Sequence, residues 1–186
     1  EKFKGSSSSL NTSMKSVGEA MAIGRSFEES FQKALRSLEV GYSGWGCDRP
    51  DKILDKKEID QLLRFPSPER IMAIRIAMIQ GMSNDEIYSI SHIDPWFLSK
   101  LRNLINLQKT HLTNKSLESL DFSHLFELKK YGFSDQQIAW ATDTSEFDVR
   151  NRRKKLSIKP LYKTVDTCAA EFASDTPYHY STYELP

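Results

Sequence analysis

The segment Gly81-Met-Ser-Asn-Asp-Glu-Ile87 has a close copy in the same chain, Gly132-Phe-Ser-Asp-Gln-Gln-Ile138. In each copy a glycine, a common helix end, is followed by a serine with Glu or Gln three residues later. That spacing is the pattern of a helix capping box. Each copy follows an amphipathic stretch, so each predicts a unit of helix, glycine stop, short helix, turn and longer helix. Two units predict two small helical clusters packed together, because two are too few for a solenoid.

The helical region begins near Ser26, which has Glu29 three residues later in a further capping-box pattern. The helix that this pattern predicts ends near Gly41, and the Gly and Pro content of Tyr42–Pro50 then predicts a loop. Three glycines in this region do not form a phosphate-binding loop, because no Lys-Ser or Lys-Thr pair follows them.

Helix signals continue from Asp55 to Lys159. The pairs Ser67-Pro68 and Asp94-Pro95 each place a proline at a first helical position, where its missing N–H costs least. Residues 110–120 predict a loop with one turn, and Thr144 or Ser145 predicts the start of the last helix.

The two ends of the chain differ from this middle. Residues 1–25 are rich in Gly and Ser, and the apolar run Ala20–Ile23 predicts a loop followed by a short strand. The tail is β-like, with Val165–Phe172 followed by three tyrosines within six positions. A strand pair without further cover is marginal in water, so the chain is expected to be a piece of a larger protein.

The predicted fold class is therefore mainly α, with two small helical clusters forming one orthogonal helical domain and short β or extended flaps at both termini. The helical domain is placed at residues 26–159, between flaps at 1–25 and 160–186.

Composition excludes several classes of function. Lys and Arg number 26 against 25 Asp and Glu, so no overall basic field gathers nucleic acid. The cysteines, Cys47 and Cys168, form no CxxC pair, which favours a reducing compartment without a disulfide framework. No apolar run approaches the length that crosses a membrane.

One alternative function is a helix-turn-helix DNA-binding module centred on residues 132–156. Five of the six residues from Arg150 to Lys155 are basic, as in a recognition helix. The competing interpretation is a compact helical unit whose last helix carries cations near its C-terminus, where the helix dipole favours them.

The remaining candidate residues give no constellation that carries chemistry. The four histidines form no pair at i, i+4 and no cluster with cysteine, so no metal site is predicted; they are His92, His111, His124 and His179. His92 is interpreted as a helix-junction residue. Cys168 is predicted to be a small buried residue in a strand, whereas Cys47 lies in a loop with the setting of an exposed residue.

Three aromatic residues are candidates for the core or for an interface. Phe97 is predicted to lie in the core, while Trp96 and Trp140 fit either the core or a subunit interface, where aromatics are enriched. The sequence thus predicts no catalytic residue, no cofactor-binding residue and no metal ligand.

The two ends carry a resemblance to a known family. Lys163–Phe172 with Thr176–Glu184 resembles the entry into the second half of the carbamoyl-phosphate synthase large subunit. Ser13–Arg25 with Phe27–Arg36 is similar to the close of that subunit's first half, and the middle matches more loosely through Ile93–Leu98 and Gly132–Ile138.

The resemblance implies a large subunit of two ATP-grasp halves. The first phosphorylates bicarbonate and adds ammonia, which a glutamine amidotransferase small subunit supplies, and the second phosphorylates the resulting carbamate. The parent would use two ATP with Mg or Mn, and K as an optional further ion. This chain would be the central oligomerisation domain, without catalytic or cofactor-binding residues of its own.

The same resemblance implies the partners and the location. The partners would be the two ATP-grasp halves, the small subunit and a second copy of the chain, with no nucleic acid and no membrane. The location would be the cytoplasm or the plastid stroma, and the parent would serve arginine or pyrimidine synthesis.

Overall fold

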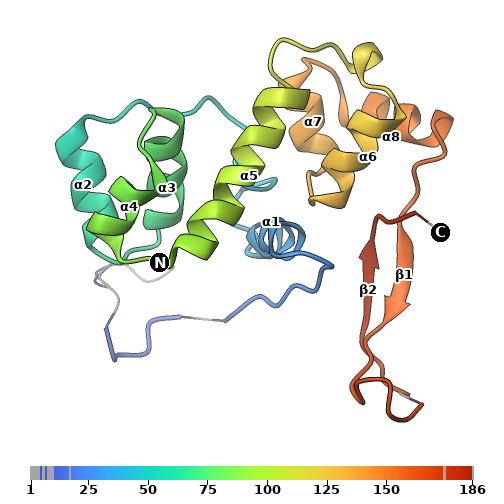
Figure 1. Ribbon diagram of the computed structural model, residues 1–186, viewed down its shortest axis with the longest axis horizontal. Helices are drawn as coiled ribbons and strands as arrows, with labels where there is room; N and C mark the ends of the chain where they lie inside the picture. The colour runs from blue at the N-terminus through green and yellow to red at the C-terminus, as the bar shows by residue number, and fades with distance from the viewer. Residues whose placement is uncertain (1–4, 6, 8–10, 17, 174, 186) are drawn as a thin grey trace.

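The computed structural model describes residues 5, 7, 11–16, 18–173 and 175–185, and it confirms a mainly α-helical fold (Figure 1). The helices are α1 (Phe27–Ser37), α2 (Lys56–Arg64), α3 (Arg70–Ile79), α4 (Asn84–Ser91), α5 (Pro95–His111), α6 (Phe122–Lys130), α7 (Asp135–Ala141) and α8 (Glu146–Lys155), with a 3-10 turn η1 (Leu117–Ser119) and strands β1 (Leu161–Thr164) and β2 (His179–Thr182).

The helices form two clusters, as the internal copy predicts. Helices α2, α3 and α4 gather on one side and α6, α7 and α8 on the other, with the long helix α5 running between them and α1 beneath it (Figure 1). The glycine stops are confirmed, since Gly81 and Gly132 have φ of 99° and 86°, a conformation that L side chains rarely adopt. The serines that follow, Ser83 and Ser134, each form a complete capping box.

Two predicted helix starts differ from the structure. The Oγ of Ser26 accepts from the backbone N–H of Glu29 at 3.2 Å, but the Glu29 carboxylate accepts from Arg25 instead of closing the box. Helix α3 does not begin after Ser67: its N–H at Arg70 donates to the Ser67 carbonyl at 3.1 Å, which closes a turn before the helix. The Ser67 hydroxyl is buried without a partner, so it caps nothing.

The core is continuous across both clusters and includes a residue from the predicted loop. Trp45 is buried to 1% exposure, in contact with Phe31 of α1 and with α3. Cys47 is equally buried, so the prediction of an exposed loop cysteine is wrong. The reason is that this stretch fills the space between the clusters instead of running over the surface.

The three aromatic residues assigned to the core or to an interface are all exposed. Phe97 is 43% exposed, which corrects its assignment to the core, and Trp96 beside it is 52% exposed. Trp140 is exposed as well. Phe97 and Trp96, at the start of α5, pack against Phe27 of α1 with ring centroids 5.3 and 5.5 Å away, respectively. The three rings form an aromatic patch that remains open to solvent.

The ends of the chain also differ from their predicted form. Residues 18–24 have no regular secondary structure, so Ala20–Ile23 is not a strand. In the tail, β1 and β2 pair antiparallel in the register Leu161 to Thr182. The predicted strand through Cys168 is absent, because the Asp166 carboxylate accepts N–H groups of Cys168 and Ala170 and folds this segment into a turn.

Candidate functional site

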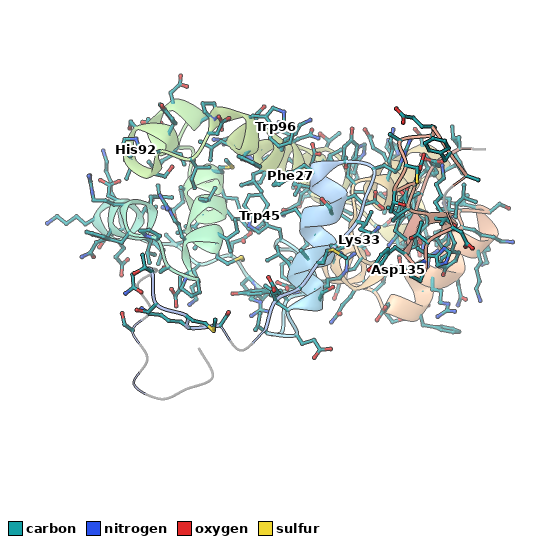
Figure 2. All side chains as sticks on the ribbon, turned by 90° about the horizontal axis from the view of Figure 1, so that it is seen from below. Phe27, Lys33, Trp45, His92, Trp96 and Asp135 are labelled. Carbon is teal, nitrogen blue, oxygen red and sulfur yellow. The ribbon has the colours of Figure 1, made fainter. Side chains whose placement is uncertain are left out.

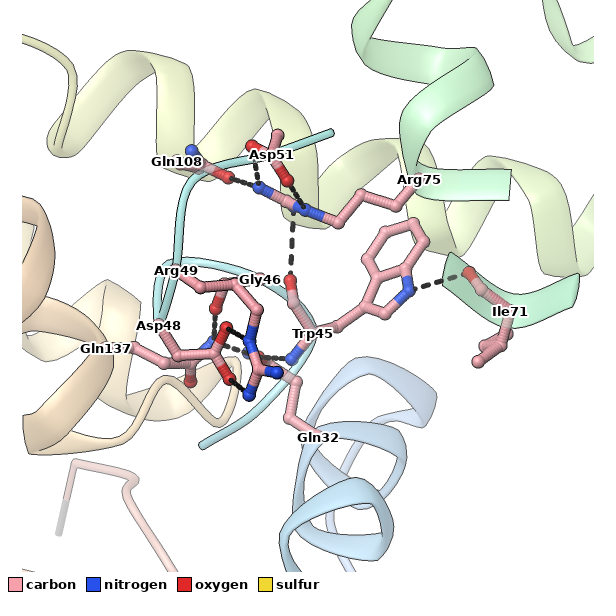
Figure 3. Close-up of polar contacts among 10 residues, drawn as sticks. All are labelled: Gln32, Trp45, Gly46, Asp48, Arg49, Asp51, Ile71, Arg75, Gln108 and Gln137. Carbon is pink, nitrogen blue, oxygen red and sulfur yellow. Dashed lines mark hydrogen bonds and ion pairs between the residues drawn. The ribbon is translucent and has the colours of Figure 1, made fainter. Parts of the chain in front are cut away.

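The loop between α1 and α2 joins the two helical clusters through buried polar contacts (Figure 3). The indole Nε1 of Trp45 donates to the Ile71 carbonyl at the start of α3, at 3.0 Å. The ring of Phe31 meets the Trp45 ring edge-on, with centroids 5.7 Å apart. Trp45 therefore anchors the loop to α1 and α3 together.

A buried arginine holds the same loop from the other side. Arg75 of α3 is 1% exposed, and its Nε and Nη2 donate to the Asp51 carboxylate at 2.8 and 3.0 Å. Its remaining donors reach the Trp45 carbonyl at 3.1 Å and the Gln108 side chain at 2.7 Å (Figure 3). A buried guanidinium is tolerable because this fork is matched to a carboxylate and each of its three nitrogens has an acceptor.

Two buried glutamines complete the contact between α1, the loop and α7. Gln137 Nε2 donates to the Gly46 carbonyl at 2.7 Å and to Gln32 Oε1 at 3.0 Å. Gln32 Oε1 also accepts from the Trp45 backbone N–H at 3.2 Å. We call this network of Gln32, Trp45, Gly46, Arg75 and Gln137 the joint.

The joint can position elements but offers no reactive group. Burial raises the pKa of the Cys47 thiol to about 12, so the nucleophilic thiolate is absent near neutral pH. The polar atoms of Arg75 and Gln137 are engaged within the protein. The arrangement is that of a rigid structural centre.

A second polar site lies where the segment before α1 meets the segment after α8. On α1, Glu29 Oε2 accepts from the Arg25 backbone N–H at 2.7 Å and from the Thr182 hydroxyl at 3.1 Å. Lys33, one turn later, pairs with Glu29 at 2.9 Å. Its Nζ donates to the Ile23 carbonyl at 2.9 Å and also to the Ser181 carbonyl.

We call the Glu29–Lys33 pair, with its contacts to Ile23, Arg25, Ser181 and Thr182, the tail clamp. One ion pair on one helix thereby fixes both the incoming and the outgoing chain. Glu29 is 1% exposed, so these contacts are shielded from water. Hydrogen bonds are stronger in such a setting than in water, because the local dielectric constant is lower.

The tail makes a further contact with the cluster of α6, α7 and α8. Lys129 is buried; its Nζ donates to the Phe133 carbonyl at 2.6 Å and pairs with Asp135 at 2.8 Å. Lys33 of α1 and Asp135 line the same hollow (Figure 2). Arg153 forks onto the same Asp135, and the ring of Tyr183 lies 5.3 Å from the Lys129 ammonium. The tail is thus docked by β2 and Tyr183, not left without cover.

Burial lowers the pKa of Lys129 to about 8, an effect that Asp135 partly offsets. A lysine with such a pKa could act as a base if substrate reached it, but its ammonium is enclosed by internal partners. Its described contacts are structural.

Three histidines, His92, His111 and His124, lie apart from both sites, whereas His179 lies on β2, with its Nδ1 3.1 Å from the Thr164 hydroxyl. His92 ends α4 with a left-handed φ of 55°, which confirms a helix-junction residue. His111 pairs with Glu127 at 2.8 Å, while His124 pairs with Asp121. Among the residues that the structure describes, no group of three or more His, Cys, Asp or Glu side chains could hold a metal ion.

Two arginines of the basic helix α8, Arg152 and Arg153, make contacts within the fold. Arg152 donates to the carbonyls of Glu118 and Leu120 at 3.0 to 3.2 Å, and Arg153 is bound to Asp135. A recognition helix needs such cations free for phosphates and bases. The helix-turn-helix resemblance is therefore one of local shape.

Sequence reasoning missed both sites, although two signals for the joint are present in the sequence. Arg75 is the lone charge inside the apolar run Ile71–Ile79, and a lone charge on a buried helix needs a buried partner. Trp45 lies between two glycines, which allow close approach of the backbone to neighbours. No local pattern indicates the long-range contacts between Gln32 and Gln137 or within the tail clamp, which join residues 105 to 153 positions apart.

The fold and its contacts define a helical domain in which the joint connects the two helical clusters and the tail clamp connects the two ends of the chain. The family described as carbamoyl-phosphate synthetase large chain, oligomerisation domain, matches residues 19–157. The chain belongs to this family. The DNA-binding alternative is not supported, since its residues lie within the matched range.

Curated relatives agree over nearly the whole chain. The carbamoyl phosphate synthase large chain of Nostoc sp. is 55% identical over 184 residues, covering 99% of this chain and 17% of the relative. The arginine-specific chloroplastic large chain of Arabidopsis thaliana is 52% identical over 186 residues, 100% of this chain and 16% of the relative. The large chain of Archaeoglobus fulgidus is 46% identical, with shares of 99% and 17%.

This chain therefore spans about one sixth of the length of these relatives. Within the residues that the structure describes, no helix is both long and apolar enough to cross a membrane.

Proposed function

We propose that this chain is the central helical part of a carbamoyl phosphate synthase large chain. The parent is an ATP-dependent ligase that makes carbamoyl phosphate from bicarbonate, glutamine-derived ammonia and two ATP, with Mg or Mn. The family match and the names of the relatives support this assignment. A glutamine amidotransferase small subunit is its partner, and the cytoplasm or a plastid is its location, in keeping with the chloroplastic relative.

The role of this part is mechanical: it holds the two ATP-grasp halves at a fixed separation, so that intermediates pass between their sites. The tail clamp is the observation that carries this proposal. Glu29 and Lys33 bind Arg25 and Ile23 on one side and Thr182 and Ser181 on the other. Those two segments are the ones that resemble the close of the first half and the entry into the second.

Two measurements test this role. The 186-residue chain alone should neither hydrolyse ATP nor bind nucleotide, and robust activity of either kind would overturn the mechanical role. In a full-length large chain carrying this segment, Lys33→Met should leave bicarbonate-dependent ATP hydrolysis by the first half largely intact. Overall carbamoyl phosphate formation should fall several-fold, because the second half is no longer held in place.

The control for this experiment is Lys109→Met, which removes an exposed lysine of α5. An equal loss in both variants, or equal losses of the partial and overall reactions in Lys33→Met, would contradict the role of the tail clamp.

A second proposed role is association between large chains, in keeping with the family description. The aromatic patch of Phe27, Trp96 and Phe97 favours it, because large exposed aromatics are enriched where proteins meet (Figure 2). Sedimentation velocity of the chain should show a concentration-dependent dimer that Trp96→Ser weakens. Phe147→Ser, on the exposed face of α8, is the control and should change nothing.

A further inference from the structure

A hollow of about 390 Å³ lies between three parts of the chain. Its walls are the extended segment Met21–Ile23, the second half of α1 and strand β2. The cations among its lining residues are Lys33 and Arg36, and none of these residues carries a carboxylate. The charged residues of this lining are therefore all cationic, whereas the neighbouring hollow of about 270 Å³, which shares Lys33 and Arg36, also has Glu29, Asp135 and Glu146 in its lining.

Of the two cations, only Arg36 is left uncompensated. Lys33 is neutralised by Glu29 at 2.9 Å. Arg36 donates through Nη1 to the Gly132 carbonyl at 2.7 Å, and among the described residues no carboxylate lies within ion-pair distance of it. The nearest acidic groups are already engaged, Glu29 by Lys33 and Asp135 by Lys129 and Arg153.

A partly buried guanidinium without an ion-pair partner carries a desolvation cost that more distant charges offset only in part. Burial accordingly lowers the pKa of Arg36, although Glu29 and Asp135 act in the opposite direction from a distance. Guanidinium presents several N–H donors in a planar fork, and one hydrogen bond to Gly132 leaves the rest available. A matching ligand would offer two oxygens in one plane.

We propose that this hollow binds a small oxyanion, a carboxylate or a phosphate, through the fork of Arg36. Tyr180 lines the same hollow from β2, and the proposal assigns its hydroxyl as a further donor. The volume admits a ligand of several heavy atoms, since a water molecule takes about 30 Å³. A bound anion would contact α1 and β2 together, so it would fasten the tail to the helical domain. This site is independent of the ligase role proposed above.

The test uses the full 186-residue chain labelled with nitrogen-15. The Nε–H signal of Arg36 is followed while sodium acetate or inorganic phosphate is added, with sodium chloride keeping the ionic strength constant. A saturable shift with either anion supports the site, and the anion that saturates at lower concentration identifies the chemical class. A linear shift no larger than that of Arg150, which is exposed on α8, would overturn it.

Variants separate the site from general charge effects. Arg36→Gln should abolish the saturable response of the Ser181 backbone amide, and Tyr180→Phe should weaken binding several-fold. Arg150→Gln removes the same charge from the surface and should leave binding unchanged. Because Arg36 also binds the Gly132 carbonyl, the wild-type titration is read directly at Arg36 and stands even if Arg36→Gln unfolds. Retained saturation in a folded Arg36→Gln chain would refute the assignment.

Discussion

Gln137 Nε2 donates to Gln32 Oε1 across 3.0 Å, although the two residues are 105 positions apart in the chain. Both side chains are fully buried, one on α7 and one on α1. The contact ties α1 to the cluster of α6, α7 and α8, while the loop residue Trp45, bound by Gln32, is hydrogen-bonded to Ile71 of α3 in the other cluster. Each cluster can form from its own capping boxes, but their relative position depends on a few buried amides and on the loop that they hold.

Replacing Gln137 by Leu should therefore destabilise the whole fold. The change leaves the Gly46 carbonyl without its donor and the Ser134 N–H without its acceptor, both in buried or half-buried settings. The expected loss in free energy of unfolding is about 3 kcal/mol, measured by urea denaturation. Gln136→Leu, at the exposed neighbouring position, is the control and should cost under about 0.5 kcal/mol. Similar losses in both variants would show that the amide network contributes little.

Gly46 should tolerate no side chain. Its φ is 85°, and a Cβ there would lie 2.1 Å from the guanidinium carbon of Arg75. Gly41 has nearly the same φ, 88°, but nothing lies within 4 Å of its Cβ position. Gly41→Ala should cost only the backbone strain, about 1 kcal/mol, whereas Gly46→Ala should cost more than about 3 kcal/mol. Equal midpoints in urea for the two variants would contradict the close packing of Arg75 against the loop.

The cysteines should differ sharply in reactivity. Burial raises the pKa of Cys47 to about 12, so at pH 8 its thiol is protonated as well as enclosed. Cys168 lies half-buried in the tail turn. An aromatic disulfide reagent at pH 8 should label one thiol per native chain quickly and the second only after unfolding. Cys168→Ser should remove the fast phase, and rapid labelling of that variant would show that the loop opens in the native state.

How much of this could be predicted depends on the range of the interactions. Ser83 and Ser134 were predictable because a capping box lies within four residues. Ser67-Pro68 is also a local signal for a helix start, yet the chain first forms a turn there, and α3 begins only at Arg70. Trp45 was assigned to a loop correctly but not to the core, because its burial depends on α1 and α3 arriving from both sides.

The tail illustrates the same limit. Its β character was predicted, and β2 forms within the tyrosine-rich segment. The docking of the tail onto α1 was not predicted, because it depends on a contact between Thr182 and Glu29, which are 153 residues apart. No periodicity within either segment indicates that contact. The absence of catalytic residues stays a prediction that the nucleotide-binding experiment addresses.

Thr182→Val should loosen the tail without disturbing the helices. The change keeps the shape of the side chain but removes the hydroxyl that donates to Glu29. Loss of one buried hydrogen bond to a charged group costs about 1.5 kcal/mol or more, which corresponds to at least a tenfold rise in local opening. Hydrogen exchange of the β1 and β2 amides should accelerate accordingly, while exchange in α5 stays constant. Thr110→Val, at an exposed position of α5, is the control, and acceleration in both variants would refute a specific role of Thr182.

Lys129 should make the stability of the fold depend on pH in the alkaline range. Its pKa is about 8 in the folded chain and about 10.4 when unfolded, so the unfolded chain binds more protons between these values. The free energy of unfolding must then rise with pH through this window, by at most about 1.4 kcal/mol per pH unit from this group. Below pH 7 the lysine is protonated in both states, and its contribution stops changing.

Lys129→Met isolates this contribution, because the other groups that titrate near pH 9 remain. The stability of the wild type relative to Lys129→Met should be constant from pH 6 to 7 and should increase by about 1 to 2 kcal/mol between pH 8 and 9.5. Lys130→Met, one residue further and exposed, should run parallel to the wild type over the whole range. A flat difference for Lys129→Met would mean that the ammonium keeps its ordinary pKa, and hence that Asp135 and the Tyr183 ring offset the cost of its burial.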